Sequence, residues 1–234
     1  MPHQRLPARE LLPIKMSPRS YIVDALRSPV TRQWWPWIAA SPFIIVLCDY
    51  LAVAPIGSQI FLWFKAPFIL GYLAAILAGF VLPFLLMVRR LRKAALAWLL
   101  ASLCFLPLAF GGIILGKKVR ISAFHGLAGR SAPLVSAVYE YIDDHEVPPE
   151  SLNQLVPAYL GRIPKTGIMA YPEYRYKVGQ EAERFEGNPW VISVFTPSGG
   201  INFDEFFYFP LQNYPDHGHG GSFQRIRQWA YLHE

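Results

Sequence analysis

The feature that most constrains this chain is a run of 23 residues, 66–88, without a charged side chain. At about 1.5 Å per residue, a helix of this length crosses a hydrocarbon layer of roughly 30 Å. Residues 94–115 form a second uncharged run, of 22 residues. A third run, at about 37–56, contains two prolines and Asp49 but has a similar apolar centre. Because backbone polar groups in lipid must be satisfied within the segment, we predict three transmembrane helices.

Composition divides the chain into a membrane part and an exposed part. Hydrophobic residues make up 53% of the 234 positions and charged residues only 16%, which is too apolar for an ordinary soluble domain. The mean hydropathy of +0.25 is nevertheless modest for a chain that lies wholly in lipid. We therefore expect a basic, proline-rich arm at 1–33, a three-helix membrane region at 34–116 and an exposed domain at 117–234.

The net charge of +6 belongs to the parts that flank the predicted spans. Residues 1–33 carry six basic and two acidic side chains, and residues 34–116 carry five and one. Residues 117–234 carry eleven basic and thirteen acidic side chains. This distribution argues against a nucleic-acid partner, because no excess of positive charge remains for the exposed domain.

The short loops predict the orientation in the membrane. Four basic residues, within 89–93, join the second and third runs, whereas only Lys65 lies between the first and second. Loops rich in Arg and Lys stay in the cytoplasm. With three spans, the N-terminal arm lies on the same side of the membrane as the loop at 89–93. We expect a multi-pass protein of the bacterial inner membrane with a cytoplasmic N-terminus and a periplasmic, extracytoplasmic C-terminal domain.

Two features inside the predicted spans are candidates for function. Gly71, Ala75 and Gly79 recur every four residues and form a stripe that lets another helix approach closely. The stripe could serve packing within this chain's own bundle, which we favour, or docking onto another subunit.

Asp49 is the acidic residue within a span, and an ionisable group at that depth is a functional candidate by default. The interpretation we favour places it near the outer interface, partnered by water or Tyr50. No second charge within the spans completes an ion path, so a transporter or channel is not expected.

The exposed domain changes from helical to strand periodicity. Gly126 and Gly129 are expected to interrupt the chain before a helix at 131–144, and a short helix should follow at about 152–159. Alternating or aromatic-rich runs then predict strands at 174–178, 190–195 and 203–209. Residues 225–232 could form a fourth strand, which we prefer, or a helix. The predicted fold is a three-helix membrane region followed by an α+β domain with a small antiparallel sheet.

No residue pattern predicts a catalytic or metal site. His217 and His219 could grip a metal, but a solvated glycine-rich loop is the simpler interpretation. Cys48 and Cys104 both fall in predicted spans, so each is expected to be a small buried apolar residue. We therefore expect no catalytic residue, no metal and no cofactor, although binding of a pigment or lipid stays open.

One stretch of the exposed domain, about residues 128–178, resembles a known family. It contains Ser151-Leu152-Asn153-Gln154-Leu155-Val156-Pro157-Ala158-Tyr159-Leu160, then Ile163-Pro164-Lys165-Thr166 and Tyr174-Arg175-Tyr176. This phrase is similar to the head of type II secretion pseudopilins and related pilin-like proteins, in which a helix precedes a small antiparallel sheet. The resemblance implies a pilin-like head. A pilin has one N-terminal apolar helix behind a leader-peptidase site, so three spans imply a head carried on a polytopic anchor and not a polymerised pilin.

These observations favour a non-enzymatic subunit of a larger inner-membrane complex. Its partners would be membrane lipids and other integral membrane subunits. The resemblance suggests an alternative, an accessory component of a type II secretion or type IV pilus-like apparatus. A third possibility is an enzyme or carrier built around Asp49 or the loop that holds His217 and His219.

Overall fold

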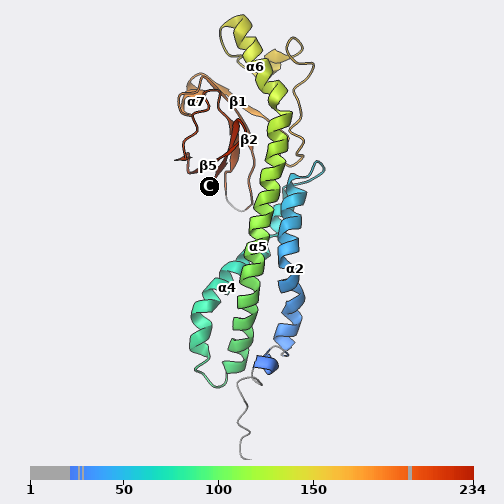
Figure 1. The fold of residues 1–234 in the computed structure, drawn as a ribbon, viewed down its shortest axis with the longest axis vertical. Coiled ribbons are helices and arrows are strands. Elements are labelled where there is room, and N and C mark those ends of the chain that lie inside the picture. Colours follow the sequence, from blue (N-terminus) through green and yellow to red (C-terminus); the bar gives the residue numbers. More distant parts are fainter. Residues whose placement is uncertain (1–21, 26, 28, 200–201) are drawn as a thin grey trace, which may run out of the picture.

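The computed structural model describes residues 22–234 except 26, 28, 200 and 201, so most of the predicted arm at 1–33 lies outside the described residues. The molecule is elongated, with a helical bundle at one end and a sheet at the other (Figure 1). One long helix passes through both parts. We call helices α2, α4 and α5 up to residue 116 the bundle, and residues 117–234 the head.

The three predicted spans are helical. Helix α2 spans Pro29–Val53, α4 spans Ala66–Leu85 and α5 spans Arg92–Arg130, while a short helix α3, Ile60–Phe64, precedes α4. All three apolar stretches are long and apolar enough to cross a membrane, with mean hydropathies of 1.7, 2.3 and 2.2. Helix α2 begins earlier than predicted, and it ends at Val53 because Pro55 disfavours helical backbone at the residue before it.

Helix α5 is continuous for 39 residues, so the expected interruption at Gly126 and Gly129 is wrong. Each glycine lowers helix stability by about 1 kcal/mol relative to alanine. Phe124, Leu127 and Ala128 on the same turns are buried in the head, and this packing outweighs the weak propensity. The predicted boundary between residues 116 and 117 therefore falls inside a single helix.

Helix α6, Ala132–His145, confirms the helix expected at 131–144. The short helix expected at about 152–159 is a single 3₁₀ turn, η1, at Leu152–Leu155. A further short helix, α7, at Gln180–Glu183, was not predicted.

The sheet has six strands, all paired antiparallel, in the order β1-β2-β3-β6-β5-β4. The strands are β1 Arg175–Val178, β2 Trp190–Phe195, β3 Glu205–Tyr208, β4 His217–Gly218, β5 Gly221–Ile226 and β6 Trp229–His233. The single strand preferred at 225–232 is wrong, because that stretch turns at Arg227 and forms the β5–β6 hairpin. Arg227 has φ 58°, a left-handed conformation that is uncommon for residues other than glycine, so the sequence did not predict a turn here.

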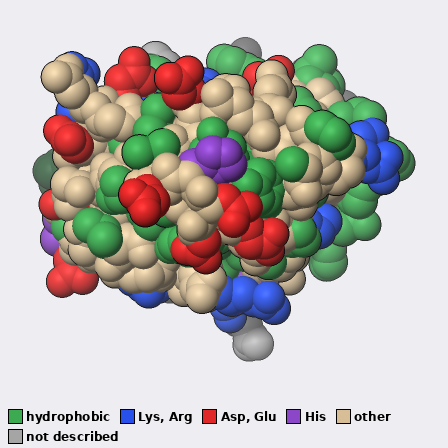
Figure 2. All heavy atoms as spheres, turned by 90° about the horizontal axis from the view of Figure 1, so that it is seen from above, with side chains coloured by type: hydrophobic (Ala, Val, Ile, Leu, Met, Phe, Trp, Pro, Cys, Tyr) green, Lys and Arg blue, Asp and Glu red, His purple; other side chains and the backbone are tan. Residues whose placement is uncertain are grey.

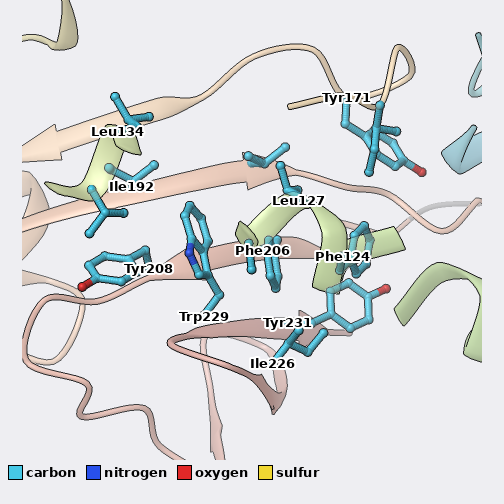
Figure 3. Close-up of a cluster of buried hydrophobic side chains, with 14 of the residues drawn as sticks. Phe124, Leu127, Leu134, Tyr171, Ile192, Phe206, Tyr208, Ile226, Trp229 and Tyr231 are labelled. Atoms are coloured by element: carbon cyan, nitrogen blue, oxygen red, sulfur yellow. The ribbon is translucent and has the colours of Figure 1, made fainter. Parts of the chain in front are cut away.

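Both faces of the central strands β2, β3 and β6 are buried. Trp190 and Ile192 of β2 and Phe206 of β3 face α5 and α6, where they join Phe124 and Leu127 in one core (Figure 3). The alternate residues Val191, Phe207 and Leu232 form a second cluster on the opposite face, with Phe185 packed against it. The period-two pattern of residues 190–195 is thus confirmed, and it reflects a sheet covered on both sides.

Candidate functional site

Two glycines bring α2 and α5 into close contact. A Cβ atom added at Gly112 would lie 2.8 Å from the Cα of Pro42, and one added at Gly116 would overlap the carboxylate of Asp49. Gly112 and Gly116 are one turn apart and so face the same side of α5. Small residues at this seam allow the two backbones to approach, and they leave space for the Asp49 side chain.

Asp49 is 3% exposed and forms an ion pair with Lys65. The Lys65 Nζ atom donates a hydrogen bond of 2.7 Å to Asp49 Oδ1, so the side-chain partner is Lys65, which was not predicted. Lys65 lies between α3 and α4, and the pair therefore links the α3–α4 corner to α2. Burial of a carboxylate is costly unless a cation or hydrogen-bond donors satisfy it, and here Lys65 does so.

One turn beyond Gly116, Arg120 fixes α5 to the loops of the head. It is 4% exposed, and its Nη1 and Nη2 atoms donate 2.9 Å hydrogen bonds to the Tyr171 hydroxyl and the Thr196 carbonyl. Within the described part of the chain, no carboxylate lies within 4.0 Å of this guanidinium. We call Asp49, Lys65, Arg120, Tyr171 and Thr196 the junction.

Tyr171 continues the hydrogen-bond chain into the head loops. Its hydroxyl accepts from Arg120 and donates to the Pro197 carbonyl at 2.8 Å. Burial raises the pKa of this hydroxyl, and the neighbouring Arg120 partly offsets that effect. Tyr171 therefore stays a neutral donor and acceptor, and it ties two loops to α5.

Two further contacts join the α3 corner to the head. The Gln59 Nε2 atom donates to the Ala170 carbonyl at 2.7 Å. Gly199 lies on Leu62, so closely that a Cβ atom there would be 3.3 Å from the Leu62 Cβ. The head is thus held by α3 as well as by α5. These contacts fix the position of the head relative to the bundle.

The head contains a second buried carboxylate, Asp204, close to the junction. It accepts hydrogen bonds from the Tyr231 hydroxyl and from the Glu234 amide, and its Oδ1 lies 3.1 Å from His233 Nδ1. Burial alone would raise the pKa of Asp204, but these hydrogen bonds and one from Ser198 outweigh burial and lower it. Several hydrogen-bond donors thus stabilise the buried carboxylate of Asp204, whereas a single lysine stabilises that of Asp49.

An apolar cavity of about 630 Å³ lies within the bundle. All three helices line it, with Trp34 from α2, Trp98 and Phe105 from α5, and Gly71 and Ala78 from α4. The Trp34 and Trp98 rings contact each other at 6.1 Å between centroids. This volume is in the range of roughly 300–1,000 Å³ that is typical of ligand sites.

The predicted small-residue stripe on α4 is divided between two surroundings. A Cβ atom added at Gly71 would lie 3.5 Å from the Phe105 ring, and Ala75 is 7% exposed, so both face the chain's own bundle and line the cavity. Gly79 has no atom within 4 Å of its Cβ position. The stripe thus serves internal packing at one end and remains open at the other.

His217 and His219 lie in β4 and in the turn that follows it. His217 begins β4, and His219 lies in the β4–β5 turn, where it stacks on Phe185 at 5.0 Å and lies 3.5 Å from Glu186. Among the residues that the structure describes, no group of three His, Cys, Asp or Glu side chains has an arrangement that could hold a metal ion. Cys48 is buried and Cys104 half-buried, and both are free.

The end of the head away from the bundle carries scattered charge. Figure 2 shows acidic side chains among apolar and neutral ones on this face. Exposed acidic residues at the end of α6, Asp143, Asp144 and Glu146, belong to this region. Asp144 accepts a 2.7 Å hydrogen bond from the Tyr159 hydroxyl, which raises the pKa of Tyr159 to about 12.

Comparison with protein-family models, curated proteins and solved structures gives no match to this chain.

The sequence reasoning missed Lys65, Arg120 and Tyr171 as site residues. One signal was present, because Gly112, Gly116 and Arg120 recur every four residues and so share one face of α5. Chemically, the junction holds two cations against one carboxylate and neutral oxygens in a buried, fully bonded arrangement. Such an arrangement can hold α5, the α3–α4 corner and the head loops in fixed positions.

Proposed function

We propose that this chain is a non-enzymatic integral membrane subunit of a larger inner-membrane complex. In this proposal the bundle crosses the membrane three times, the N-terminus is cytoplasmic and the head lies in the periplasm. The observation that carries the proposal is the continuity of α5, which runs from the bundle into the core of the head and is locked there by Arg120.

A locked junction favours a structural role over a moving one. Arg120, Gln59 and Gly199 hold the head from two directions, at α5 and at α3. A head held in this way presents its surface at a fixed height above the bundle. That property suits a subunit that positions other proteins, whereas a carrier needs two alternative arrangements of its site.

Helix α4 supplies the surface for a partner. Only 11% of its most apolar stretch is buried, compared with 39% for α2. Gly79 lies on this poorly covered helix with open space around it. A small residue on an open helix face lets a partner helix approach its backbone closely, and packing of this kind stabilises association between helices in lipid.

Purification of the full-length tagged protein in mild detergent, followed by quantitative mass spectrometry, tests the proposal. We expect integral membrane proteins to co-purify, and we expect Gly79→Phe to lower their recovery roughly tenfold because the open stripe is blocked. Leu115→Phe, on an exposed site of α5, is the matched control. Protease added to spheroplasts should also trim the head.

Three outcomes would contradict the proposal. The first is a monomer that purifies alone, and the second is equal recovery of partners with Gly79→Phe and with the native chain. The third is a head protected from protease in spheroplasts but cleaved once the membrane is opened, because that result would place the head in the cytoplasm.

One arrangement in the head favours the alternative, an accessory role in a type II secretion or type IV pilus-like apparatus. Within residues 128–178, where the resemblance lies, helix α6 precedes the antiparallel sheet in the chain. Co-purification of a secretion ATPase or of pseudopilins in the same experiment would select this alternative, and their absence would remove it.

A further inference from the structure

The cavity in the bundle has an apolar lining, and basic residues lie beyond one of its ends. Trp34, Trp98 and Ala78 line the end of the cavity that faces the α4–α5 loop. Trp98 is six residues from the start of α5 at Arg92, or roughly 9 Å along the helix. Arg89 and Arg90 in this loop are exposed, as is Arg32 two residues before Trp34. The loop at this end of the bundle is therefore positively charged.

The cavity lies at a depth that one acyl chain can reach from the basic loop. On α5 its lining runs from Trp98 to Phe105, which is roughly 9–20 Å along the helix from Arg92. A hydrocarbon core of about 30 Å gives each leaflet roughly 15 Å, so this lining begins inside the leaflet nearest Arg92 and reaches the bilayer centre. An acyl chain whose headgroup lies at the level of the basic loop would therefore run along it.

The cavity is a partly open groove across α5, with α2 on one side and α4 on the other. Two of its lining residues, Trp34 and Trp98, are 44% and 43% exposed. A flexible apolar chain can follow such a groove without any change in the helices. A partner helix, about 10–12 Å wide with its side chains, is the competing occupant, and lipid binding in the absence of a partner protein distinguishes the two.

We propose that this cavity holds one acyl chain of an anionic phospholipid whose phosphate is bound by Arg89 and Arg90. The inference rests on the proposed function, since it requires the bundle to lie in a membrane with this loop at the cytoplasmic leaflet. Basic residues at that leaflet attract anionic lipids, and arginine forms paired hydrogen bonds with phosphate oxygens. The lipid fills a space that would otherwise leave α4 poorly supported.

Native mass spectrometry of the delipidated full-length protein tests this directly. The protein is titrated in detergent with dioleoyl phosphatidylglycerol and, in parallel, with dioleoyl phosphatidylcholine. We expect one phosphatidylglycerol to bind per chain, roughly 30-fold more tightly than phosphatidylcholine if each arginine contributes the usual attraction to an anionic lipid. Glycerol phosphate at the same concentration should not compete, because it has no chain to bury.

Two pairs of variants separate the chain site from the headgroup site. Ala78→Phe fills the cavity and should abolish binding, whereas Leu77→Phe, on an exposed neighbouring position outside the lining, should not. Replacing Arg89 and Arg90 by Gln should remove the preference for phosphatidylglycerol. The exposed pair Lys117 and Lys118, replaced by Gln at the far end of the bundle, should preserve it. Gel filtration of each variant checks that it remains folded.

Equal binding of the two lipids, or full binding by a folded Ala78→Phe variant, would overturn the inference. Competition by glycerol phosphate would also overturn it, since a free phosphate site would then suffice. These results leave the proposed function standing if the protein still co-purifies with membrane partners. Extraction of the chain from membranes by alkaline carbonate, without detergent, would instead refute both proposals.

Discussion

Helix α5 uses two different kinds of packing along its length. In the bundle its closest approach to α2 is at Gly112 and Gly116. In the head its contacts with the sheet are made through Phe124 and Leu127, both fully buried. Phe124 stacks on Phe206 at 5.3 Å between ring centroids. The same helix thus presents small residues on one half and large ones on the other.

The difference follows from the medium that each half is suited to. In water, burial of large apolar side chains drives folding, at roughly 25 cal/mol per Å² of apolar surface. Among lipid chains that driving force is absent, so helices associate through close van der Waals contact and buried polar pairs. The glycine seam and the Asp49–Lys65 pair are of the second kind, and the aromatic core of the head is of the first.

The two buried carboxylates extend this comparison. Asp49 in the bundle has one charged partner, Lys65, whereas Asp204 in the head has several hydrogen-bond donors. Removal of a single partner should therefore have a larger effect in the bundle than in the head.

The largest effect is expected for Lys65→Met. This variant leaves the Asp49 carboxylate, 3% exposed, without its cation, and loss of one partner of a buried ion pair lowers the free energy of unfolding by about 3–5 kcal/mol. The double variant Asp49→Asn with Lys65→Met should recover most of this loss. Thermal unfolding in detergent measures both, with the exposed Lys118→Met as control. A native melting temperature for Lys65→Met would show that the pair is not needed.

A smaller effect is expected for Gly112→Val. The new Cβ would lie 2.8 Å from the Cα and 3.2 Å from the carbonyl oxygen of Pro42, and these backbone atoms can move away only if α2 and α5 separate. Overpacking of this kind lowers the free energy of unfolding by about 1–3 kcal/mol. Gly111→Val is the matched control, since it carries the same helix penalty but has no atom within 4 Å. If the two variants unfolded alike, the seam would not be a close contact.

Local sequence patterns were sufficient to predict the helices and the strand that carry a clear periodicity or a long apolar run. The uncharged runs at 66–88 and 94–115 predicted α4 and the first part of α5, and the alternation at 190–195 predicted β2 with its correct bounds. These signals are visible because each element carries its own periodicity or length.

The features that were not predicted depend on contacts far apart in the chain. Arg120 binds residues 51 and 76 positions away, Tyr171 and Thr196, and neither position has a distinctive local pattern. The continuity of α5 depends on burial of Phe124 against the sheet, which overrides the glycines. The β5–β6 hairpin turns at Arg227, where no glycine, proline or asparagine marks it.

The smallest effect is expected in the head, where Asp204 is held by several donors. Because its pKa is lowered from the ordinary 3.8, the folded head binds a proton at this site less readily than the unfolded chain. The stabilisation from this carboxylate is therefore complete above about pH 4, the unfolded value, and is lost as the pH falls through the folded value. Asp204→Asn should lower the free energy of unfolding by roughly 1 kcal/mol at pH 7, the usual contribution of a lost hydrogen bond.

The difference between Asp204→Asn and the native protein should disappear under acid conditions, because protonated aspartic acid and asparagine are both neutral. Tryptophan fluorescence reports on this unfolding, since Trp190 and Trp229 are buried in the head core. Asp216→Asn, at an exposed position, should follow the native curve at every pH. An effect of Asp204→Asn at pH 7 as large as that of Lys65→Met would refute the comparison, because a carboxylate with several donors would then be as sensitive as one that depends on a single cation.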